Sequence, residues 1–245
     1  MTIKVGVFGA KGRMGSEVCR AVEADADLEL AAAVDLDDDP QELVTAEVEV
    51  AVDFTTPDSV KDNIRFCLDN GIHAVVGTTG LTEADRTEIG GWASSGKANV
   101  FIAPNFAIGA VLMMDFAARA AAHFETAEIV ERHHERKLDA PSGTALRTAE
   151  LMNEGRTEPW KTPAGGSETL EGSRGGEVSG IRIHSLRVPG SVAHQEVVLG
   201  TAGETLTIRH DSLDRASFMP GVVLAIKKVA SRDGLTVGLE NLLDV

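Results

Sequence analysis

Cysteine is scarce in the 245-residue chain, and positive charge is outnumbered. The only two cysteines, Cys19 and Cys67, stand far apart, with no CxxC or Cys/His spacing. This excludes a disulfide framework and a zinc ribbon, and it fits a reducing compartment. Against 38 Asp and Glu stand 23 Lys and Arg, which gives a net charge of −15. Such a balance argues against a protein that binds nucleic acid or an anionic membrane, because those partners require clustered cations.

Long apolar runs are also missing. No run approaches the roughly 18 residues that a membrane-spanning helix requires. The chain begins with the strand-like MTIKVGVFG rather than with a charged and then apolar leader, so we expect a cytoplasmic protein. Hydrophobic residues still make up 43% of the chain, which is enough to form the core of one large domain or two modest ones.

The first hundred residues alternate short apolar runs with amphipathic stretches. Strands are predicted at Ile3–Phe8, Leu28–Val34, Val48–Phe54, His73–Val76 and Asn99–Ala103, and helices at Arg13–Glu23, Asp58–Asp69 and Thr82–Ser95. This order predicts a doubly wound parallel sheet with helices on both faces. Such sheets bind ligands at the carboxyl ends of their strands, so the functional loops are expected there.

The pattern changes after Asn105. Helices are predicted at Ile108–Ala122 and Thr144–Asn153, and strands of an antiparallel or mixed sheet at Ile181–Val188, Gln195–Leu199 and Thr205–Arg209. The stretch Gly155–Gly180 is rich in Gly, Pro and Ser and is expected to be a functional or mobile loop. A last helix, about Ala216–Ala230, has an apolar face that needs a partner. We therefore predict a discontinuous first domain, residues 1–106 and 216–245, interrupted by a second domain, residues 107–215.

A glycine loop joins the first predicted strand to the first helix. In VGVFGAKGRMG, Gly9, Gly12 and Gly15 are three residues apart, so the backbone can approach a pyrophosphate beside the amides of a helix N-terminus. The usual dinucleotide fingerprint is GxGxxG, and here Lys11 occupies its middle position. A turn that merely packs the helix closely against the strand is the alternative interpretation.

Two residues bear on which dinucleotide is bound. Asp35 follows the second strand about twenty residues after the loop, where an acidic residue binds the ribose hydroxyls of NAD. Alternatively, it only opens the acidic turn Asp35–Asp39. Lys11 favours the opposite preference, because a cation can neutralise the 2′-phosphate of NADP. Gly77–Gly80 also follows a strand, and it either contacts the cofactor or starts the helix at Thr82 with a cap.

The segment ERHHERKLDAPSGTA, residues 131–145, concentrates groups capable of chemistry. His133 and Lys137 are four apart, which places them on one face of a strand or of a helical turn and suits proton transfer near neutral pH. Ser142–Thr144 precedes a predicted helix and forms a candidate carboxylate site. A solvated charged edge is one alternative. A metal site of His133, His134 and Glu131 is another, but the spacing lacks HExxH and we predict no metal.

Taken together, these motifs resemble those of the bacterial 4-hydroxy-tetrahydrodipicolinate reductases, also called dihydrodipicolinate reductases. VGVFGAKGRMG, VDFT, GTTG, APNFAIGA and ERHHERKLDAPSGTA occur in the same order, followed by IHSLR, GSVAHQEV and SLDRASFMPGV. The resemblance implies an α/β protein with a discontinuous Rossmann-type parallel sheet and a central α+β substrate and tetramerisation domain containing a mixed sheet. It also implies a homotetramer that uses NADH or NADPH to reduce a cyclic dicarboxylate in the diaminopimelate and lysine pathway.

The same resemblance assigns roles to individual residues. His133 and Lys137 would handle the proton, with the donor left open between them, while hydride adds at C4 of the substrate. The substrate carboxylate would be bound by His134, Gly143 and Thr144, to which the predicted helix start adds Ser142. The dinucleotide would be bound by Gly9, Ala10, Lys11, Gly12, Arg13, Met14, Asp35, Gly77, Thr78, Thr79, Ala103, Pro104, Asn105 and Phe106.

Two other functions fit parts of the sequence. Another small-molecule NAD(P)-dependent dehydrogenase would share the glycine loop, but the ERHHERKLDAPSGTA string favours the reductase. A dinucleotide sensor without turnover would need the loop alone, so the presence of both His133 and Lys137 argues against it.

Overall fold

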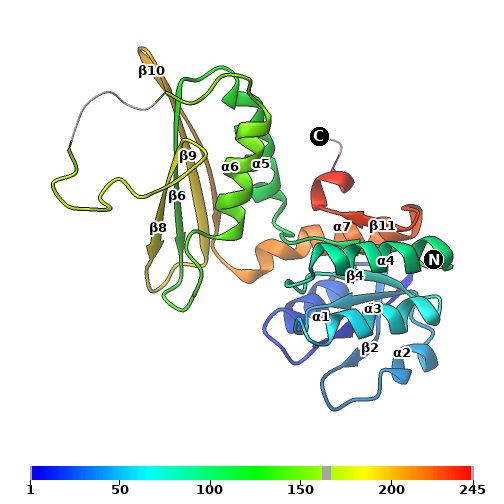
Figure 1. Cartoon of the computed structure of the whole chain (residues 1–245). Coiled ribbons are helices and arrows are strands. Elements are labelled where there is room, and N and C mark those ends of the chain that lie inside the picture. Colours follow the sequence, from blue (N-terminus) through cyan, green and yellow to red (C-terminus); the bar gives the residue numbers. More distant parts are fainter. Residues whose placement is uncertain (1, 162–166, 244–245) are drawn as a thin grey trace. The chain divides into compact units, whose positions relative to one another are not determined.

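The computed structural model of the chain describes residues 2–161 and 167–243 (Figure 1). It contains two compact units. One is formed by the chain up to Ile108 together with the segment that begins at Arg215, and the other by Gly109–Asp214.

The first unit is built on a six-stranded parallel sheet. Its strands are β1 (Ile3–Phe8), β2 (Leu28–Val34), β3 (Val50–Asp53), β4 (His73–Val76), β5 (Val100–Ile102) and β11 (Leu235–Val237), in the order β11-β5-β4-β3-β1-β2. The prediction of a doubly wound parallel sheet is therefore confirmed. Strand β11 was not predicted, because three residues are too few to show a period.

Helices cover both faces of this sheet. They are α1 (Gly15–Ala24), α2 (Gln41–Thr45), α3 (Val60–Asp69), α4 (Glu83–Ser95) and α7 (Met219–Lys228). Helix α1 packs beside α7, and α3 beside α4. Ile64 of α3 and Ile89 of α4 belong to one hydrophobic core together with strand residues such as Val76. Val22 of α1 and Ile226 of α7 are also fully buried but are not members of that core. The continuous helix predicted at Ala216–Ala230 is instead α7 flanked by 3₁₀ turns at Arg215–Phe218 and Val229–Ser231.

The second unit contains a mixed five-stranded sheet. Its strands are β6 (Thr126–His133), β7 (Gly176–Val178), β8 (Ile181–Arg187), β9 (Ala193–Thr201) and β10 (Glu204–Ser212), in the order β10-β9-β6-β8-β7. Among the described strands of this unit, β6 and β8 pair in parallel and the other neighbours are antiparallel. Helices α5 (Ile108–Ala121) and α6 (Gly143–Glu154) lie on one side of this sheet (Figure 1) and bury Ile129, Ile183 and Leu199.

Two sequence predictions in this unit need correction. Strand β6 was not predicted at all, and the stretch Gly155–Gly180, expected to be a loop, contains the whole of β7. Residues 162–166 of that stretch lie outside the described part of the chain.

Among the residues that are described, no helix is long and apolar enough to cross a membrane.

Candidate functional site

The carboxyl ends of the parallel strands meet at one edge of the first sheet. The register pairs Phe8 with both Val34 and Asp53, and it pairs Val76 with both Asp53 and Ile102. The loops that follow these strands therefore begin at the same level. This arrangement brings together the residues predicted to bind a dinucleotide, namely Gly9–Met14, Asp35, Gly77–Thr79 and Ala103–Phe106.

The glycine loop leaves no room for side chains at two of its positions. Gly9 has a φ of +74°, and a Cβ there would lie 2.6 Å from the carbonyl oxygen of Phe54. A Cβ on Gly15 would lie 2.0 Å from the carbonyl oxygen of Gly9. The loop is thus folded tightly against the start of the ten-residue helix α1. Residues 11–13 of the loop are exposed beside this helix N-terminus, where folds of this kind bind the pyrophosphate of a dinucleotide.

Lys11 is engaged by the acidic turn that follows β2. Its backbone N–H donates to Asp35 Oδ2 over 2.7 Å, and its Nζ lies 3.1 Å from Asp38 Oδ2. Hydrogen bonds from the backbone N–H groups of Leu36 and Lys11 lower the pKa of Asp35, which keeps this carboxylate ionised. The lysine predicted to meet a 2′-phosphate is therefore already paired with Asp38.

Asp53 is a buried carboxylate that the sequence analysis did not identify. It is 3% exposed and ends β3. Its Oδ1 accepts hydrogen bonds from the hydroxyls of Thr78 (2.6 Å) and Thr55 (2.8 Å), and its Oδ2 accepts one from Asn63 Nδ2 (2.8 Å). Asp53 thereby connects the loops after β3 and β4. The hydroxyl of Thr78, a residue predicted to contact the cofactor, donates to this carboxylate.

Phe54, the residue after Asp53, packs closely on the GTTG loop. A Cβ on Gly77 would lie 2.1 Å from the Phe54 ring, so only glycine fits there. The Phe54 ring also lies 5.8 Å from that of Phe106, centre to centre. The adjoining helix α4 begins with a reciprocal capping box between Thr82 and Asp85, as the alternative interpretation of this loop required.

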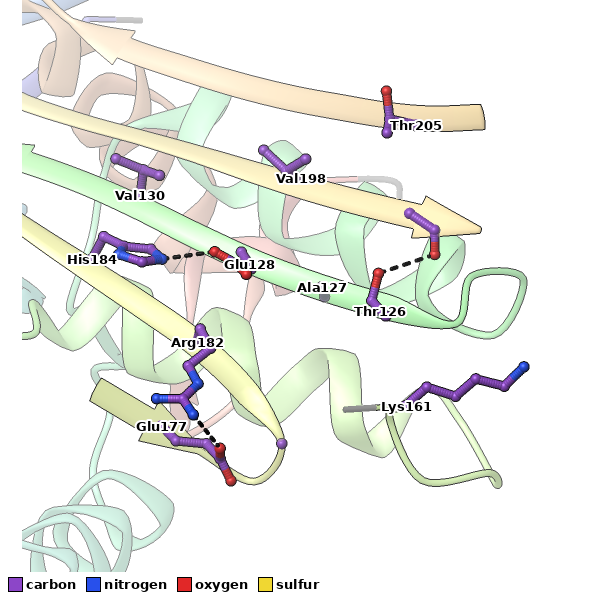
Figure 2. Close-up of a pocket in the computed structure, with 12 residues that line it drawn as sticks. Thr126, Ala127, Glu128, Val130, Lys161, Glu177, Arg182, His184, Val198 and Thr205 are labelled. Carbon is purple, nitrogen blue, oxygen red and sulfur yellow. Dashed lines mark hydrogen bonds and ion pairs between the residues drawn. The ribbon is translucent and has the colours of Figure 1, made fainter. Parts of the chain in front are cut away.

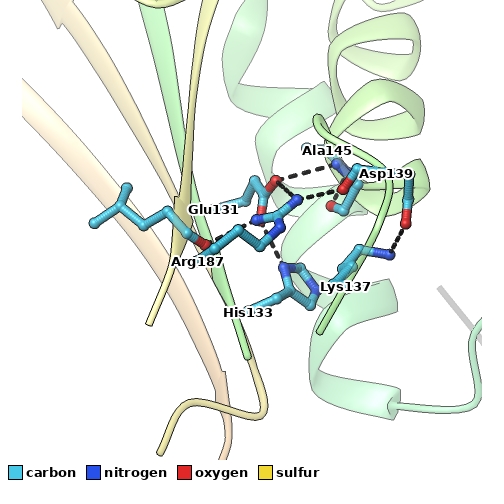
Figure 3. A network of polar contacts seen from close by, with 8 residues as sticks. Glu131, His133, Lys137, Asp139, Ala145 and Arg187 are labelled. Carbon is cyan, nitrogen blue, oxygen red and sulfur yellow. Dashed lines mark hydrogen bonds and ion pairs between the residues drawn. The ribbon is translucent and has the colours of Figure 1, made fainter. Parts of the chain in front are cut away.

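In the second unit, the two predicted proton-handling residues occupy different kinds of structure. His133 is the last residue of β6, whereas Lys137 lies in the irregular segment after it. The expectation that both share one face of a strand or helical turn is therefore wrong. The Nζ of Lys137 lies 2.8 Å from Asp139 Oδ1 (Figure 3). The backbone N–H of Lys137 donates to the carbonyl oxygen of His134.

The side chain of Glu131 is fully buried and joins several elements of this unit. Its Oε2 lies 2.5 Å from His133 Nδ1, and Arg187 of β8 approaches both carboxylate oxygens at 2.9 Å (Figure 3). The backbone N–H of Ser142 donates to Oε1 over 3.2 Å. Burial acts to raise the pKa of Glu131, but hydrogen bonds from His133, Arg187 and Ser185 outweigh it and lower the pKa to about 2.

The sequence alone suggested Glu131 only as an alternative metal ligand, and it gave no role to Arg187, the last residue of the IHSLR motif. The arginine is 56 residues away, and no short-range pattern links the two. Within the described residues there is no group of three or more His, Cys, Asp or Glu side chains arranged to hold a metal ion.

Helix α6 begins beside Glu131 and His133. Ser142 is its N-cap, and the Ser142 hydroxyl accepts a hydrogen bond from the backbone N–H of Ala145. Gly143 is exposed, and nothing lies within 4 Å of the position that a Cβ would take there. The first-turn amides of a helix have no partner inside the helix, so this end is suited to an anionic group such as a carboxylate.

A separate cavity of about 430 Å³ lies on the face of the mixed sheet that α5 and α6 do not cover (Figure 2). In this cavity, Glu128 Oε2 lies 2.8 Å from His184 Nε2, and Glu128 also forms an ion pair with Arg174. Even-numbered residues of β6 point to this face, whereas Glu131 points to the helices. The cavity is therefore separate from the network of Glu131, His133 and Arg187. It is lined by Thr126, Ala127, Glu128, Val130, Lys161, Glu177, Gly180, Arg182, His184, Val198, Gly200 and Thr205.

Comparison with known protein families gives two matches that together span most of the chain. The family described as "Dihydrodipicolinate reductase, N-terminus" matches residues 3–106. The family described as "Dihydrodipicolinate reductase, C-terminus" matches residues 109–243.

Individual proteins resemble the chain over its whole length. A 4-hydroxy-tetrahydrodipicolinate reductase of Mycolicibacterium smegmatis is 55% identical over 99% of this chain and 100% of that protein. One of Nocardia farcinica is 54% identical over 100% of both. Among solved structures, a dipicolinate-bound dihydrodipicolinate reductase from Paenisporosarcina sp. TG-14 superposes with a TM-score of 0.89 and 41% identity, covering 99% of this chain and 100% of that one.

Proposed function

The chain belongs to the dihydrodipicolinate reductase family, and on this premise we propose how its residues perform the reaction. The protein is an oxidoreductase that reduces 4-hydroxy-tetrahydrodipicolinate to tetrahydrodipicolinate with NAD(P)H, a step of diaminopimelate and lysine biosynthesis. The substrate gains one hydride and one proton and loses its hydroxyl group as water. The observation that carries our assignment of roles is the pairing of the buried Glu131 with His133 beside the start of α6.

The unit that begins with β1 holds the dinucleotide. The dinucleotide is bound at the carboxyl ends of the parallel strands, by Gly9–Met14, Asp35, Gly77–Thr79 and Ala103–Phe106. The close packing at Gly9 and Gly15 fits a pyrophosphate. When bound, the reduced nicotinamide supplies hydride. This unit comprises residues 1–106 and 216–245 in our assignment, of which residues 1, 244 and 245 lie outside the described part of the chain.

The middle unit, residues 107–215, binds the substrate. The start of α6, with Ser142, Gly143 and Thr144, receives a substrate carboxylate together with His134. His133 acts as the acid–base group, and Lys137 is the other proton-donor candidate. We place the enzyme in the cytoplasm, where its pathway operates.

The activity is tested by the absorbance of the reduced nicotinamide. Supplying enzymatically generated 4-hydroxy-tetrahydrodipicolinate should produce a loss of NADH or NADPH absorbance that depends on the protein. A dinucleotide sensor would bind NADH without this loss. No oxidation above background with either cofactor would refute the reductase assignment.

We propose that both NADH and NADPH are used, with Lys11 and Asp38 setting the balance. Lys11→Ala should raise KM for NADPH more than for NADH, because a cation near the 2′-phosphate is lost. Asp38→Asn should do the reverse and lower KM for NADPH, since it releases the Lys11 ammonium. Each change should be roughly two- to fivefold, as expected for exposed charges.

The matched control for this pair is Lys97→Ala. Lys97 is exposed and precedes β5, at the amino end of the sheet, so its loss should leave both KM values unchanged. If Lys11→Ala raised the KM values for NADH and NADPH equally, Lys11 would contact the pyrophosphate that both cofactors share.

We further propose that the enzyme is a homotetramer assembled through the face of the mixed sheet that α5 and α6 leave uncovered. Val130 and Val198 stand on this face among paired charges, and Leu186 is 39% exposed there. Light scattering after size exclusion should give four times the 25.8 kDa chain mass. Val198→Arg should reduce that mass, because it inserts an unpaired cation into the interface. A wild-type mass of one chain would contradict the proposal.

A further inference from the structure

We propose that Glu131, held by Arg187, is the residue that positions His133 for proton transfer, with imidazole Nδ1 bound to the carboxylate and Nε2 left for the substrate. This inference rests on the proposed function, in which His133 is the acid–base group. Glu131 does not itself touch the reacting atoms in this scheme, so it is a positioning residue.

The location of Glu131 is set by the strand that carries both residues. Ala127, Ile129 and Glu131 alternate along β6 on the face covered by helices, and His133 continues this series at the end of the strand. Ala127 and Ile129 belong to the apolar core, yet Glu131 occupies the next inward position with a fully buried side chain. A carboxylate in such a place is costly unless it is paired, so its presence calls for a reason beyond packing.

The partners of Glu131 keep it ionised. Arg187, which the parallel register places directly opposite His133, approaches both oxygens of the carboxylate at 2.9 Å. Ser142 adds a backbone N–H. An ionised carboxylate can only accept hydrogen bonds, so the hydrogen between it and His133 belongs to Nδ1. The Nε2 atom is then the nitrogen that gains and loses the transferred proton.

The same arginine extends the network to the loop that carries Lys137. Arg187 Nη2 donates to the backbone carbonyl oxygen of Asp139, and the Asp139 carboxylate holds Lys137 (Figure 3). The charged groups around His133 are therefore Glu131 on its own strand, Arg187 on β8, and the Lys137–Asp139 pair on the loop. One buried ion pair joins the end of β6, this loop and the start of α6.

The first test replaces the charge of Glu131 with little change of shape. Glu131→Gln should lower kcat by about 10- to 100-fold, within the range that a positioned acid–base group contributes, while KM for the dinucleotide stays unchanged. Glu150→Gln removes an exposed, ion-paired glutamate on α6 and should change neither quantity.

A double-mutant cycle separates positioning from a structural role. Glu131 acts through His133, so adding Glu131→Gln to His133→Ala should lower kcat by less than twofold further. If Glu131→Gln lowered kcat in the His133→Ala background as much as it does in the wild-type enzyme, the inference would be overturned. If His133→Ala itself leaves kcat at the wild-type value, then the proposed function of His133 is wrong, a result distinct from failure of the Glu131 assignment.

A measurement on the wild-type enzyme covers the case in which Glu131→Gln does not fold. Nitrogen-15 spectra of histidine-labelled protein, with the His133 signal assigned by its absence in His133→Ala, report which ring nitrogen carries hydrogen. The expected neutral form has hydrogen on Nδ1. A neutral His133 with hydrogen on Nε2 would overturn the inference without any Glu131 variant.

Discussion

His133→Ala should lower kcat by about 10²–10⁴-fold while leaving the affinity for NADH nearly unchanged, because acid–base groups typically contribute that much and the dinucleotide is assigned to other residues. His133 ends β6 with its ring tied to Glu131, and its removal takes away the proton but not the substrate-binding helix start. Steady-state kinetics and NADH titration of the same preparation measure the two quantities. A purely structural histidine would instead lower thermal stability and cofactor affinity together.

The neighbouring residues distinguish this assignment from its alternatives. Lys137→Ala should also reduce kcat, and a folded Lys137→Ala protein with wild-type kcat and KM would remove Lys137 from the mechanism. His134→Ala should chiefly raise KM for the substrate, as expected for a residue that binds ground and transition states alike. A large fall in kcat with unchanged KM at His134, beside a mild effect at His133, would show that the two histidines had been exchanged.

Gly15→Ala should prevent tight binding of the dinucleotide and destabilise the protein. The new Cβ would lie 2.0 Å from the carbonyl oxygen of Gly9, and since this neighbour is backbone, the whole loop must move. Overpacking of this kind typically costs about 1–3 kcal/mol of unfolding free energy. We expect KM for NADH to rise at least tenfold, because a displaced loop no longer fits the pyrophosphate. Urea unfolding and NADH titration measure both effects.

The chain supplies a matched control for this substitution. Gly91 lies on the exposed side of α4, and nothing is within 4 Å of the position that a Cβ would take. Gly91→Ala should therefore leave KM unchanged and stabilise the helix by about 0.5–1 kcal/mol. If both variants behaved alike, the effect at Gly15 would not come from the close approach of Gly9.

The parallel sheet could be predicted because its strands are buried on both faces. Runs such as Ile3–Phe8 and His73–Val76 are mostly apolar and separated by amphipathic helices, and the predicted bounds of those two strands agree with the structure. Short elements were missed. Leu235–Val237 and Gln41–Thr45 contain too few residues to display a period of either two or 3.6.

Strand β6 was missed for a different reason. Its alternation of buried residues continues through Glu131, a charged residue in an inward position, so the pattern looked like a polar segment. The partner that allows this burial, Arg187, lies on another strand, and pairing between distant strands is not visible in local sequence. For the same reason, the sequence identified His133 and Lys137 but not the ion pair that joins them to the sheet.

The position of β11 constrains the order in which the protein can fold during synthesis. This strand comes from the end of the chain, yet it pairs with β5, which is completed more than a hundred residues earlier. Residues Val100–Ile102 are buried in the finished fold, but until Leu235–Val237 leaves the ribosome they form an exposed apolar edge of the kind that invites pairing with other chains. The intervening unit Gly109–Asp214 is complete before then, so the nascent nucleotide domain must stay open while its insertion forms.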